Sequence, residues 1–320
     1  MATGEFGLIE KFFDRPSGRS DVILAVGDDC ALLAPPPAGQ NLALSIDTLV
    51  SGVHFFPDTD PRGLGHKALA VNLSDLAASG AQPAWCSLAL TLPRIDEAWL
   101  SEFAAGFFAL ASEHNISLVG GDTTQGPLSI TVQVIGTTPS GQALLRSGAK
   151  ANDLIYVSGP IGNAGLGLLG RQGSWLIEDP TLYAALETPS PRIELGLSLL
   201  GIASACIDIS DGLAADLGHI LDRSQVGAEI DWDLLPLSEA VREYVAHHGD
   251  LGFPLRTGDD YELCFTAPSH HRGEVETILR KLGLNGACIG QIETTPGLRV
   301  KHASESIHLE IPGYEHFSPS

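Results

Sequence analysis

The sequence predicts a mixed α/β or α+β fold in two domains, and three observations support this fold class. Short runs of branched residues bounded by turn signals recur along the chain, as expected for strands. Segments with apolar residues at helical spacing lie between those runs, so strands and helices alternate. The length of 320 residues suits two domains of ordinary size, and an apolar content of 44% is enough for packed cores.

The expected strands are short, apolar and followed by turn residues. In chain order they occupy residues 22–26, 42–46, 87–92, 117–119, 129–135, 154–157, 228–230, 263–265 and 287–289. The expected helices lie at about residues 61–79, 96–113, 190–201, 212–223, 237–247 and 271–282. Two helix starts are explicit, because Asp60 precedes Pro61 as an N-cap and Asp96 precedes an apolar periodicity in the same way.

A glycine-rich segment at residues 158–170 follows one of the expected strands. It lacks the Gly-Lys-Ser/Thr ending of a P-loop and the GxGxxG spacing of a dinucleotide-binding turn. We therefore favour a hinge or helix-packing segment over a phosphate loop. A domain boundary near residue 150 follows, with an N-terminal domain at 1–150 and a C-terminal domain at 151–320.

Composition excludes several classes of partner and compartment. The net charge of −21, from 18 basic and 39 acidic residues, disfavours nucleic acid and anionic membranes, which bind clustered Lys and Arg. No run of about 18 apolar residues predicts a transmembrane helix. Glu5, Glu10 and Asp14 interrupt any signal peptide, and five scattered cysteines without a CxxC pair predict neither disulfides nor a zinc site. We expect a soluble cytoplasmic protein.

Six acidic motifs share one context, an aspartate beside glycine or serine at a strand end or within an apolar helix. They are residues 27–29, 45–47, 72–75, 120–122, 208–212 and 258–262. Residues 72–78 (NLSDLAA) also resemble residues 208–215 (DISDGLAA), apart from one inserted glycine. Strand ends beside flexible turns are where α/β proteins gather ligand groups, although each motif alone also fits ordinary turn or N-cap chemistry.

Asp75 is the most unusual of these acids. The helical segment 67–79 is apolar almost all round, which predicts burial, and Asn72, Asp75 and Ser79 form its one polar stripe. A carboxylate in such surroundings is costly unless a cation compensates it. The sequence therefore predicts a cation at Asp75.

Basic residues near the acidic motifs are few: Lys67, Arg146 and Lys150 cannot neutralise so many carboxylates. Oxygen ligands without a His or Cys cluster indicate several Mg²⁺ ions, with nucleotide phosphate as a further ligand. Arg146 either holds phosphate oxygens or is a solvated loop charge. His54 lies in an apolar, strand-like segment, where a lone histidine is more often a core residue than a ligand.

Eight motifs in one order resemble the thiamine-monophosphate kinase family. They are GDDCALL, DTLVSGVHF, KALAVNLSDLAASGA, GGDTT, RSGAK, DISDGL, GDDYELCF and GYEHF, and they span residue 5 to about residue 317. That family lies in the superfamily of aminoimidazole-ribonucleotide and selenophosphate synthetases. The resemblance implies a homodimer whose N-terminal domains share a β-barrel, and a C-terminal domain that closes over the active site. It also implies direct in-line transfer of the ATP γ-phosphoryl group to thiamine monophosphate, giving thiamine diphosphate.

The resemblance also assigns roles to residues. The metal ligands it implies are Asp29, Ser45, Ile46, Asp47, Asp75, Asp122, Asp208 and Asp211, with Asp28 as a possible helper. The ATP contacts are Gly121, Asp122, Arg146 and Ser210, and the thiamine-phosphate contacts are His54, Asp259 and Tyr314. Asp47, Asp75, Asp122 and Arg146 carry the catalytic roles. Two positions depart from the family: relatives often have threonine at Ile46 and glutamate at Asp259.

Two other functions compete with this one. A selenophosphate or amidine-forming synthetase would use another acceptor. A resemblance to the selenium enzymes would imply a reactive cysteine near the N-terminus, and this chain has no cysteine before Cys30. A non-catalytic cation buffer would concentrate its acids in one DxDxDG loop. Here the acids are spread over about 230 residues, which favours a nucleotide site.

Overall fold

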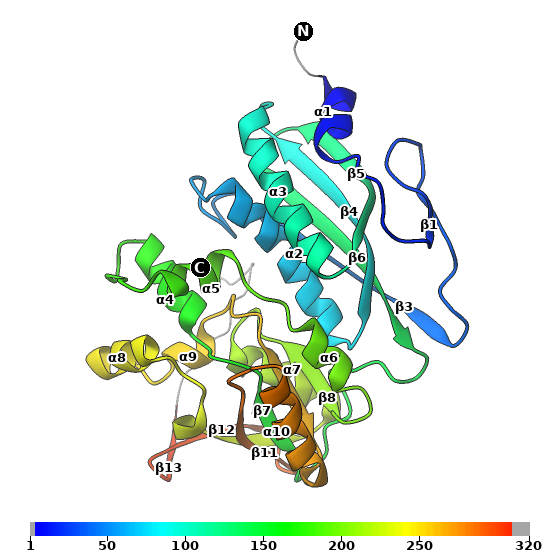
Figure 1. The fold of residues 1–320 in the computed structure, drawn as a ribbon. Helices are drawn as coiled ribbons and strands as arrows, with labels where there is room; N and C mark the ends of the chain where they lie inside the picture. The colour runs from blue at the N-terminus through cyan, green and yellow to red at the C-terminus, as the bar shows by residue number, and fades with distance from the viewer. Residues whose placement is uncertain (1–3, 309–320) are drawn as a thin grey trace. The chain divides into compact units, whose positions relative to one another are not determined.

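The computed structural model describes residues 4–308, which divide into two compact units (Figure 1). The N-terminal unit comprises the residues up to Leu76 together with Ala81–Gly141. The C-terminal unit comprises Ala77–Gly80 and the residues from Gln142 onwards. Both units mix helices and strands, so the predicted fold class is confirmed.

The N-terminal unit is built on a four-stranded sheet of order β3-β6-β4-β5, in which β4 and β5 are parallel and the other pairs antiparallel. Its elements are α1 (Glu5–Phe12), β1 (Val22–Leu24), β2 (Leu32–Leu33), β3 (Gln40–Val50), α2 (Pro61–Ala78), β4 (Gln82–Leu92), α3 (Glu97–Glu113), β5 (Ser117–Gln125) and β6 (Ser129–Pro139). Figure 1 shows α2 and α3 together on one face of this sheet.

The two helices start where the sequence predicts. Asp60 accepts a hydrogen bond from the Gly63 amide at 2.8 Å, and Asp96 accepts one from the Trp99 amide at 3.1 Å. Helix α2 is buried on nearly all sides, as its apolar composition indicates. The helices approach closely through glycine, because a Cβ on Gly106 would lie 1.9 Å from the Arg62 carbonyl oxygen. This packing holds α2 over the sheet, and α2 carries Asp75.

The C-terminal unit contains a seven-stranded sheet of order β13-β12-β9-β11-β7-β10-β8 within the described residues, with β9 and β12 parallel. Its strands are β7 (Leu154–Val157), β8 (Ala205–Asp208), β9 (Gly227–Asp231), β10 (Leu263–Ala267), β11 (Ala287–Glu293), β12 (Gly297–His302) and β13 (Glu305–Ile307). Its helices are α4 (Asn163–Arg171), α5 (Pro180–Glu187), α6 (Ile193–Ser198), α7 (Leu213–Ser224), α8 (Glu239–His248), α9 (Phe253–Arg256) and α10 (Arg272–Lys281), with short 3₁₀ turns at Trp232–Leu234 and Ser269–His271.

One large apolar cluster forms the core of this unit. Ile155, Ile207 and Ile289 of the sheet are at most 2% exposed, and Leu217 and Ile220 of α7 belong to the same cluster. Burial of this kind contributes about 25 cal/mol per Å² of apolar surface removed from water. The core therefore fixes the end of β8, where the acidic motif at 208–212 begins, and the start of β10, where the acidic motif at 258–262 ends.

The differences from the predicted elements have local causes. The strand expected at 117–119 continues to Gln125, because Gly120 and Gly121 lie in extended pairing with β4 rather than in a turn. The strand expected at 42–46 is the central part of β3. Helices α1, α4, α5 and α9 and strands β2, β8, β12 and β13 were not predicted, since they are short or rich in glycine and polar residues.

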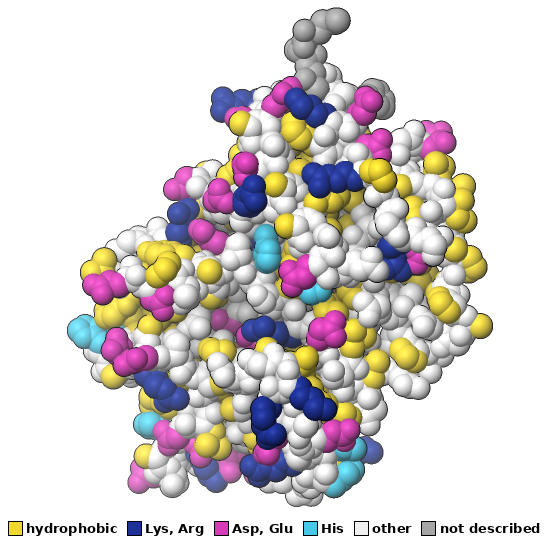
Figure 2. All heavy atoms as spheres, in the orientation of Figure 1, with side chains coloured by type: hydrophobic (Ala, Val, Ile, Leu, Met, Phe, Trp, Pro, Cys, Tyr) yellow, Lys and Arg dark blue, Asp and Glu magenta, His cyan; other side chains and the backbone are white. Residues whose placement is uncertain are grey.

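Among the described residues, no helix is long and apolar enough to span a bilayer. On the face drawn in Figure 2, Lys and Arg side chains are interspersed with Asp and Glu and form no continuous basic patch.

Candidate active site

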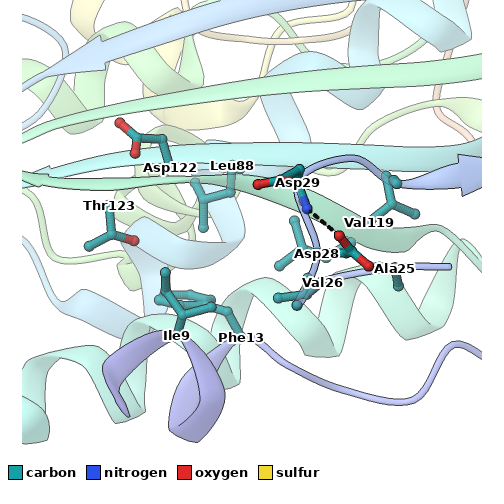
Figure 3. Close-up of a pocket in the computed structure, with 15 residues that line it drawn as sticks. Ile9, Phe13, Ala25, Val26, Asp28, Asp29, Leu88, Val119, Asp122 and Thr123 are labelled. Atoms are coloured by element: carbon teal, nitrogen blue, oxygen red, sulfur yellow. Dashed lines mark hydrogen bonds between the residues drawn. The ribbon is translucent and has the colours of Figure 1, made fainter. Parts of the chain in front are cut away.

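A cavity of about 530 Å³ lies in the N-terminal unit, between α1, the turn after β1 and strands β4 and β5. Figure 3 shows Ile9 of α1 and Phe13, directly after α1, on one side of it and Asp29 and Asp122 on the other. Its acidic and glycine-rich lining consists of Gly27, Asp28, Asp29, Gly120, Gly121, Asp122 and Thr123, and its apolar lining includes Ile9, Phe13, Val26, Leu88, Leu118 and Val119. The cavity thus has one apolar wall and one acidic wall.

Strand β5 can supply this acidic wall because Gly121 allows a close approach to β4. A Cβ on Gly121 would lie 1.8 Å from the carbonyl oxygen of Leu88, its partner in the parallel pairing. Asp122, the next residue, is exposed at the cavity. Gly121 and Asp122, two of the predicted nucleotide contacts, therefore lie in the middle of β5, just past the predicted strand end at residue 119.

The turn between β1 and β2 supplies the other acids. Gly27 has φ +117°, a backbone conformation that other residues rarely adopt. The Asp28 carboxylate accepts a hydrogen bond from the Asp29 amide at 2.8 Å, and both residues are exposed (Figure 3). Asp28, Asp29 and Asp122 consequently line one cavity.

A second polar group lies between β3 and α2. The Ser45 hydroxyl donates to the Asp75 carboxylate at 2.5 Å, and the Asp47 amide donates to the Asn72 side-chain oxygen at 3.0 Å. Asn72 is 1% exposed and also donates to the Ala68 carbonyl at 3.0 Å. The structure therefore brings together Ser45, Asp47 and Asp75, and it gives Asn72 a structural role that holds β3 against α2.

One expectation for this group needs correction. Asp75 is only partly buried, because the strand that it faces, β3, is an edge strand of the sheet. Ile46 is 58% exposed and, by the alternation of side chains along a strand, points away from Ser45 and Asp47. Only its main-chain carbonyl could contribute to a site shared with them.

His54 is half-buried in the turn that follows β3. Its Nδ1 accepts a hydrogen bond from the Val50 amide at 3.0 Å, and its own amide donates to the Val50 carbonyl at 3.0 Å. The ring therefore helps to close this turn and is not a core residue.

In the C-terminal unit, Asp208 ends β8, and the loop that follows carries Ser210 and Asp211. One oxygen of Asp216, on α7, accepts hydrogen bonds from the amides of Ser210 and Asp211, both at 3.1 Å. Asp216 is 2% exposed, and its burial raises its pKa to about 7, against the opposing charge of nearby Arg146. Sequence reasoning missed Asp216, although an acid among the apolar residues of α7 was a usable signal.

The loop 257–262 is joined to this loop through the backbone. The Asp259 amide donates to the Ser210 carbonyl at 2.9 Å, and the Tyr261 amide donates to the Ile209 carbonyl at 2.8 Å. Asp259 and Tyr261 have positive φ values of 66° and 49°, which are uncommon outside glycine. The Tyr261 hydroxyl donates to the Asp259 carboxylate at 3.1 Å. The predicted substrate contact Asp259 therefore lies beside the predicted ATP contact Ser210.

The contacts of Asp260 show what the glycine-rich segment at residues 158–170 does in the fold. Its carboxylate accepts hydrogen bonds from the amides of Gly162 at 2.7 Å and Ala164 at 3.2 Å, at the start of α4. Loss of contact with water raises the pKa of Asp260 to about 8. A Cβ on Gly167 would lie 2.4 Å from the Leu182 carbonyl oxygen. These amides already have an acidic partner, so the segment packs a helix, as predicted, and the phosphate-loop interpretation is not supported.

Arg146 and Lys150 are exposed in the loop before β7. The Ser224 hydroxyl oxygen accepts hydrogen bonds from the amides of Gly148 at 3.1 Å and Ala149 at 3.2 Å, which orders this loop. Both predictions for Arg146, a phosphate contact and a solvated charge, are compatible with this exposure.

The predicted residues thus form three local groups. The first is Asp29, Gly121 and Asp122, the second is Ser45, Asp47 and Asp75, and the third is Asp208, Ser210, Asp211 and Asp259. Tyr314 lies outside the described residues. Within residues 4–308, no group of three or more Asp, Glu, His and Cys side chains could hold a metal ion by itself.

Comparisons with known proteins agree with this arrangement. Residues 27–138 match the AIR synthase related protein N-terminal domain, and residues 150–303 match the corresponding C-terminal domain. The chain is 49% identical to thiamine-monophosphate kinase of Escherichia coli strain K12, over 99% of each chain. The thiamine-monophosphate kinase structure from Stenotrophomonas maltophilia K279a is 47% identical, with a TM-score of 0.84 over 91% of this chain and 93% of that one. A structure described as AaThiL complexed with AMPPCP and TMP is 30% identical, with a TM-score of 0.77 over 88% and 89%.

Proposed function

Since the chain belongs to the thiamine-monophosphate kinase family and shares its ATP-dependent phosphorylation of thiamine monophosphate, we propose that the cavity of the N-terminal unit binds the nucleotide. The observation that carries this proposal is the pairing of an apolar wall with an acidic, glycine-rich one. A volume of about 530 Å³ is in the usual range for small-molecule sites. A similar fold is known in complex with AMPPCP, a non-hydrolysable relative of ATP.

Each wall suits one part of a nucleotide. Ile9, Phe13 and Leu118 offer a flat apolar surface for a purine base. Gly121 brings exposed backbone to the other wall, where phosphate oxygens can approach without a side chain in the way. The carboxylates of Asp29 and Asp122 lie at this wall and, without a cation, would repel phosphate.

The acidic wall fits Mg²⁺. This ion usually takes one or two protein carboxylates and completes its octahedron with water and substrate phosphates, so a full protein cage is not needed. Asp29 and Asp122 would supply such ligands in the cavity, and Asp47, Asp75, Asp208 and Asp211 are further candidates. When bound, Mg²⁺ would neutralise phosphate charge and align the two substrates.

The remaining chemistry asks little of the protein. The acceptor is a phosphate monoester oxygen that is ionised near neutral pH, so no general base is required, and the in-line reaction needs positioning and charge neutralisation. Arg146 would place a guanidinium on transferring phosphate. Asp259 would place a carboxylate near the permanently cationic thiazolium ring, with His54 and Tyr314 as further substrate contacts.

We also propose that the enzyme is a homodimer that pairs through β3. Leu42, Leu44 and Ile46 are 46%, 58% and 58% exposed along one face of this edge strand. An exposed apolar row on an edge strand favours association with another chain. Leu44→Lys should convert a dimer to a monomer by light scattering, whereas Leu176→Lys, at another exposed leucine, should not. A wild-type monomer would contradict the pairing.

A cytoplasmic location completes the proposal. All five cysteines are free, which suits a reducing compartment, and ATP is available there.

The activity is tested directly by supplying ATP, Mg²⁺ and thiamine monophosphate and following thiamine diphosphate by chromatography. Asp122→Asn should reduce the rate by more than about 100-fold, since groups that merely support metal ligands are worth roughly 10–100-fold. Asp14→Asn, at an exposed acid outside the cavity, is the matched control. ADP formed only with another acceptor would indicate a synthetase, and Mg²⁺ binding that is indifferent to ATP would indicate a cation buffer.

A further inference from the structure

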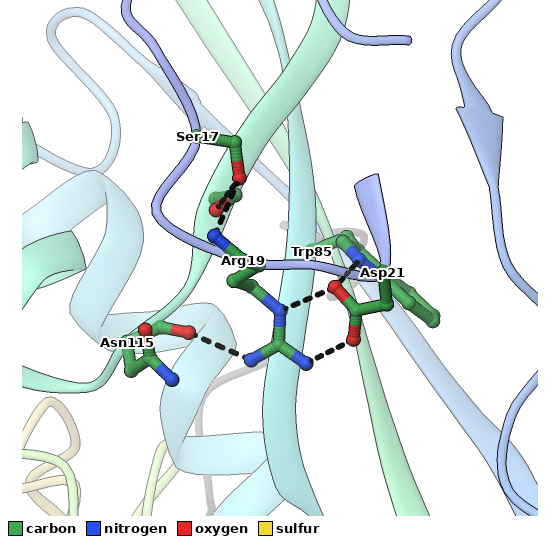
Figure 4. A network of polar contacts seen from close by, with 6 residues as sticks. Ser17, Arg19, Asp21, Trp85 and Asn115 are labelled. Atoms are coloured by element: carbon green, nitrogen blue, oxygen red, sulfur yellow. Dashed lines mark hydrogen bonds and ion pairs between the residues drawn. The ribbon is translucent and has the colours of Figure 1, made fainter. Parts of the chain in front are cut away.

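The segment that leads into the acidic turn is fixed to the sheet by a polar network (Figure 4). The Arg19 guanidinium contacts Asp21 through two hydrogen bonds, Nε to Oδ1 at 2.9 Å and Nη2 to Oδ2 at 2.5 Å. Its third nitrogen, Nη1, donates to the Asn115 carbonyl at 3.0 Å. Trp85 of β4 donates from its indole nitrogen to Asp21 Oδ1 at 3.2 Å. All three guanidinium nitrogens of Arg19 therefore have partners.

Ser17 provides a further attachment. Its hydroxyl lies 2.8 Å from the hydroxyl of Ser117, at the start of β5, and it accepts a hydrogen bond from the Arg19 amide at 3.1 Å. The network thus connects one short segment to both β4 and β5, the strands that form the floor of the cavity. Bidentate Arg–carboxylate contacts fix orientation as well as distance.

The pair is shielded from solvent to a degree that gives it weight. The side chains of Arg19 and Asp21 are 18% and 32% exposed, and Trp85 is 3% exposed. The neighbouring guanidinium lowers the pKa of Asp21 below its ordinary value. A partly buried, bidentate pair of this kind contributes more than a fully exposed surface ion pair does.

Asp21 also begins the hairpin that carries the acidic turn. Its carbonyl accepts a hydrogen bond from the Ala34 amide at 2.8 Å, and Val22 pairs with Leu33 at the base of β1 and β2. The strands have three and two residues, and an isolated hairpin of this size is marginally stable in water. Its apolar support is a small cluster around Ala84, Trp85 and Val119. The polar network is therefore a main attachment of the hairpin.

We propose that Arg19 and Asp21 are positioning residues that hold the Asp28–Asp29 turn at the acidic wall of the cavity, which Asp122 also lines. Neither residue lines the cavity, so both act through the hairpin. This inference rests on the proposed Mg²⁺-nucleotide site. The turn has one hydrogen bond of its own between Asp28 and Asp29, so the distance from Asp29 to Asp122 depends on how the base of the hairpin is held.

The test compares Arg19→Gln with Arg62→Gln. Arg62 contacts Glu102 at 2.8 Å in the same unit, but the two side chains are 60% and 49% exposed, so its loss should be silent. Arg19→Gln should raise the Mg²⁺ concentration for half-maximal rate and the KM for ATP by about tenfold, the usual effect of removing support from a metal ligand. The KM for thiamine monophosphate should change by less than about twofold.

Two measurements are independent of turnover. Hydrogen exchange of a peptide covering residues 22–34 should be faster in Arg19→Gln than in the wild type, and calorimetry should show weaker binding of Mg²⁺ with a non-hydrolysable ATP analogue. Trp85→Phe keeps a buried ring but removes the donor to Asp21, so it should shift the same quantities less. Arg19→Lys should recover part of the loss.

The outcomes separate the two proposals. If the wild type binds the Mg²⁺-analogue but Arg19→Gln binds it equally well with unchanged exchange at residues 22–34, the positioning role is wrong and the nucleotide site stands. An equal rise in KM for both substrates would also overturn it, because that is the effect of general damage. If the wild type binds no Mg²⁺-analogue, the nucleotide site and the positioning role both fail.

Discussion

Replacement of Arg192 by methionine should destabilise the C-terminal unit through an uncompensated buried charge. Glu262 is 4% exposed. Its carboxylate accepts hydrogen bonds from the Arg192 guanidinium, from Nε at 2.8 Å and from Nη2, and a further one from the Ser158 hydroxyl. Methionine keeps the length and apolar stem of arginine but leaves the carboxylate without a cation. The same loop carries Asp259, so its integrity matters to the substrate contact that we propose.

The expected magnitude follows from burial. Removing one partner of a buried pair costs about 3–5 kcal/mol. The Arg192 side chain is 23% exposed, so water can screen part of the remaining charge and the lower end of this range, about 3 kcal/mol, applies. For a unit of this size each kcal/mol lowers Tm by roughly 2–4 °C, which gives a fall of about 6–12 °C.

The assay is thermal or urea unfolding, followed by circular dichroism. Arg272→Met is the matched control, because Arg272 and Glu276 form an exposed pair whose loss should cost less than about 1 kcal/mol. The double variant Arg192→Met/Glu262→Gln should recover much of the loss, since no buried charge remains. A small loss in the single variant, or a double variant less stable than the single one, would refute the reasoning.

Three further outcomes are expected. Asp75→Asn should lower turnover by more than about 100-fold while shifting Tm by only a few degrees, because an amide oxygen still accepts the Ser45 hydrogen bond; steady-state kinetics and a melting curve check both. Gly121→Ala should lose nucleotide binding or the fold, since its Cβ would lie 1.8 Å from the β4 backbone. Gly120→Ala is the control, because a Cβ at Gly120 has nothing within 4 Å and the methyl group should be tolerated. Calorimetry with an ATP analogue compares the two variants. The pKa of Asp260 is raised to about 8, so the native state binds the carboxyl proton more tightly than the unfolded state does. The stability that the protonated carboxyl group contributes is therefore lost as pH rises through about 8. Asp260→Asn should flatten the decrease in urea midpoint between about pH 5 and 8.

The sequence was sufficient for the elements whose local signals agree with their burial. Helix α2 is apolar on all sides and starts at an Asp-Pro pair, and both features survive in the structure. Strand β5 shows the limit of such reasoning. Its Gly120-Gly121-Asp122 sequence is typical of a turn, yet close approach to Leu88 keeps it extended. That approach depends on the neighbouring strand, which local propensity does not include.

Candidate site residues could be named from the sequence one by one, but their grouping could not. The motifs identified Asp29 and Asp122 as ligand candidates. These two residues are 93 positions apart in the chain, and only the fold places them on one cavity. The burial of Asp75 was also overestimated. The apolar sequence of α2 predicts a helix that is covered on all sides, but at Asp75 the helix faces β3, which is an edge strand. Sheet order, which decides what covers a side chain, is a property of the whole unit.

The repeated sequences NLSDLAA and DISDGLAA show how different local structures serve one purpose. Asp75 lies within α2, whereas the inserted Gly212, with φ +109°, ends the loop of Asp211 before α7 begins. In both places a buried polar side chain on the helix accepts a hydrogen bond from the backbone amide of a candidate ligand. Asn72 accepts one from Asp47, and Asp216 accepts one from Asp211. The Arg19–Asp21 pair acts similarly on the hairpin of Asp29. Carboxylates that repel one another must be held in place before a cation arrives, and in each case the holding group is itself buried or paired. The Mg²⁺ site that we propose would therefore depend on these supports as well as on the carboxylates themselves.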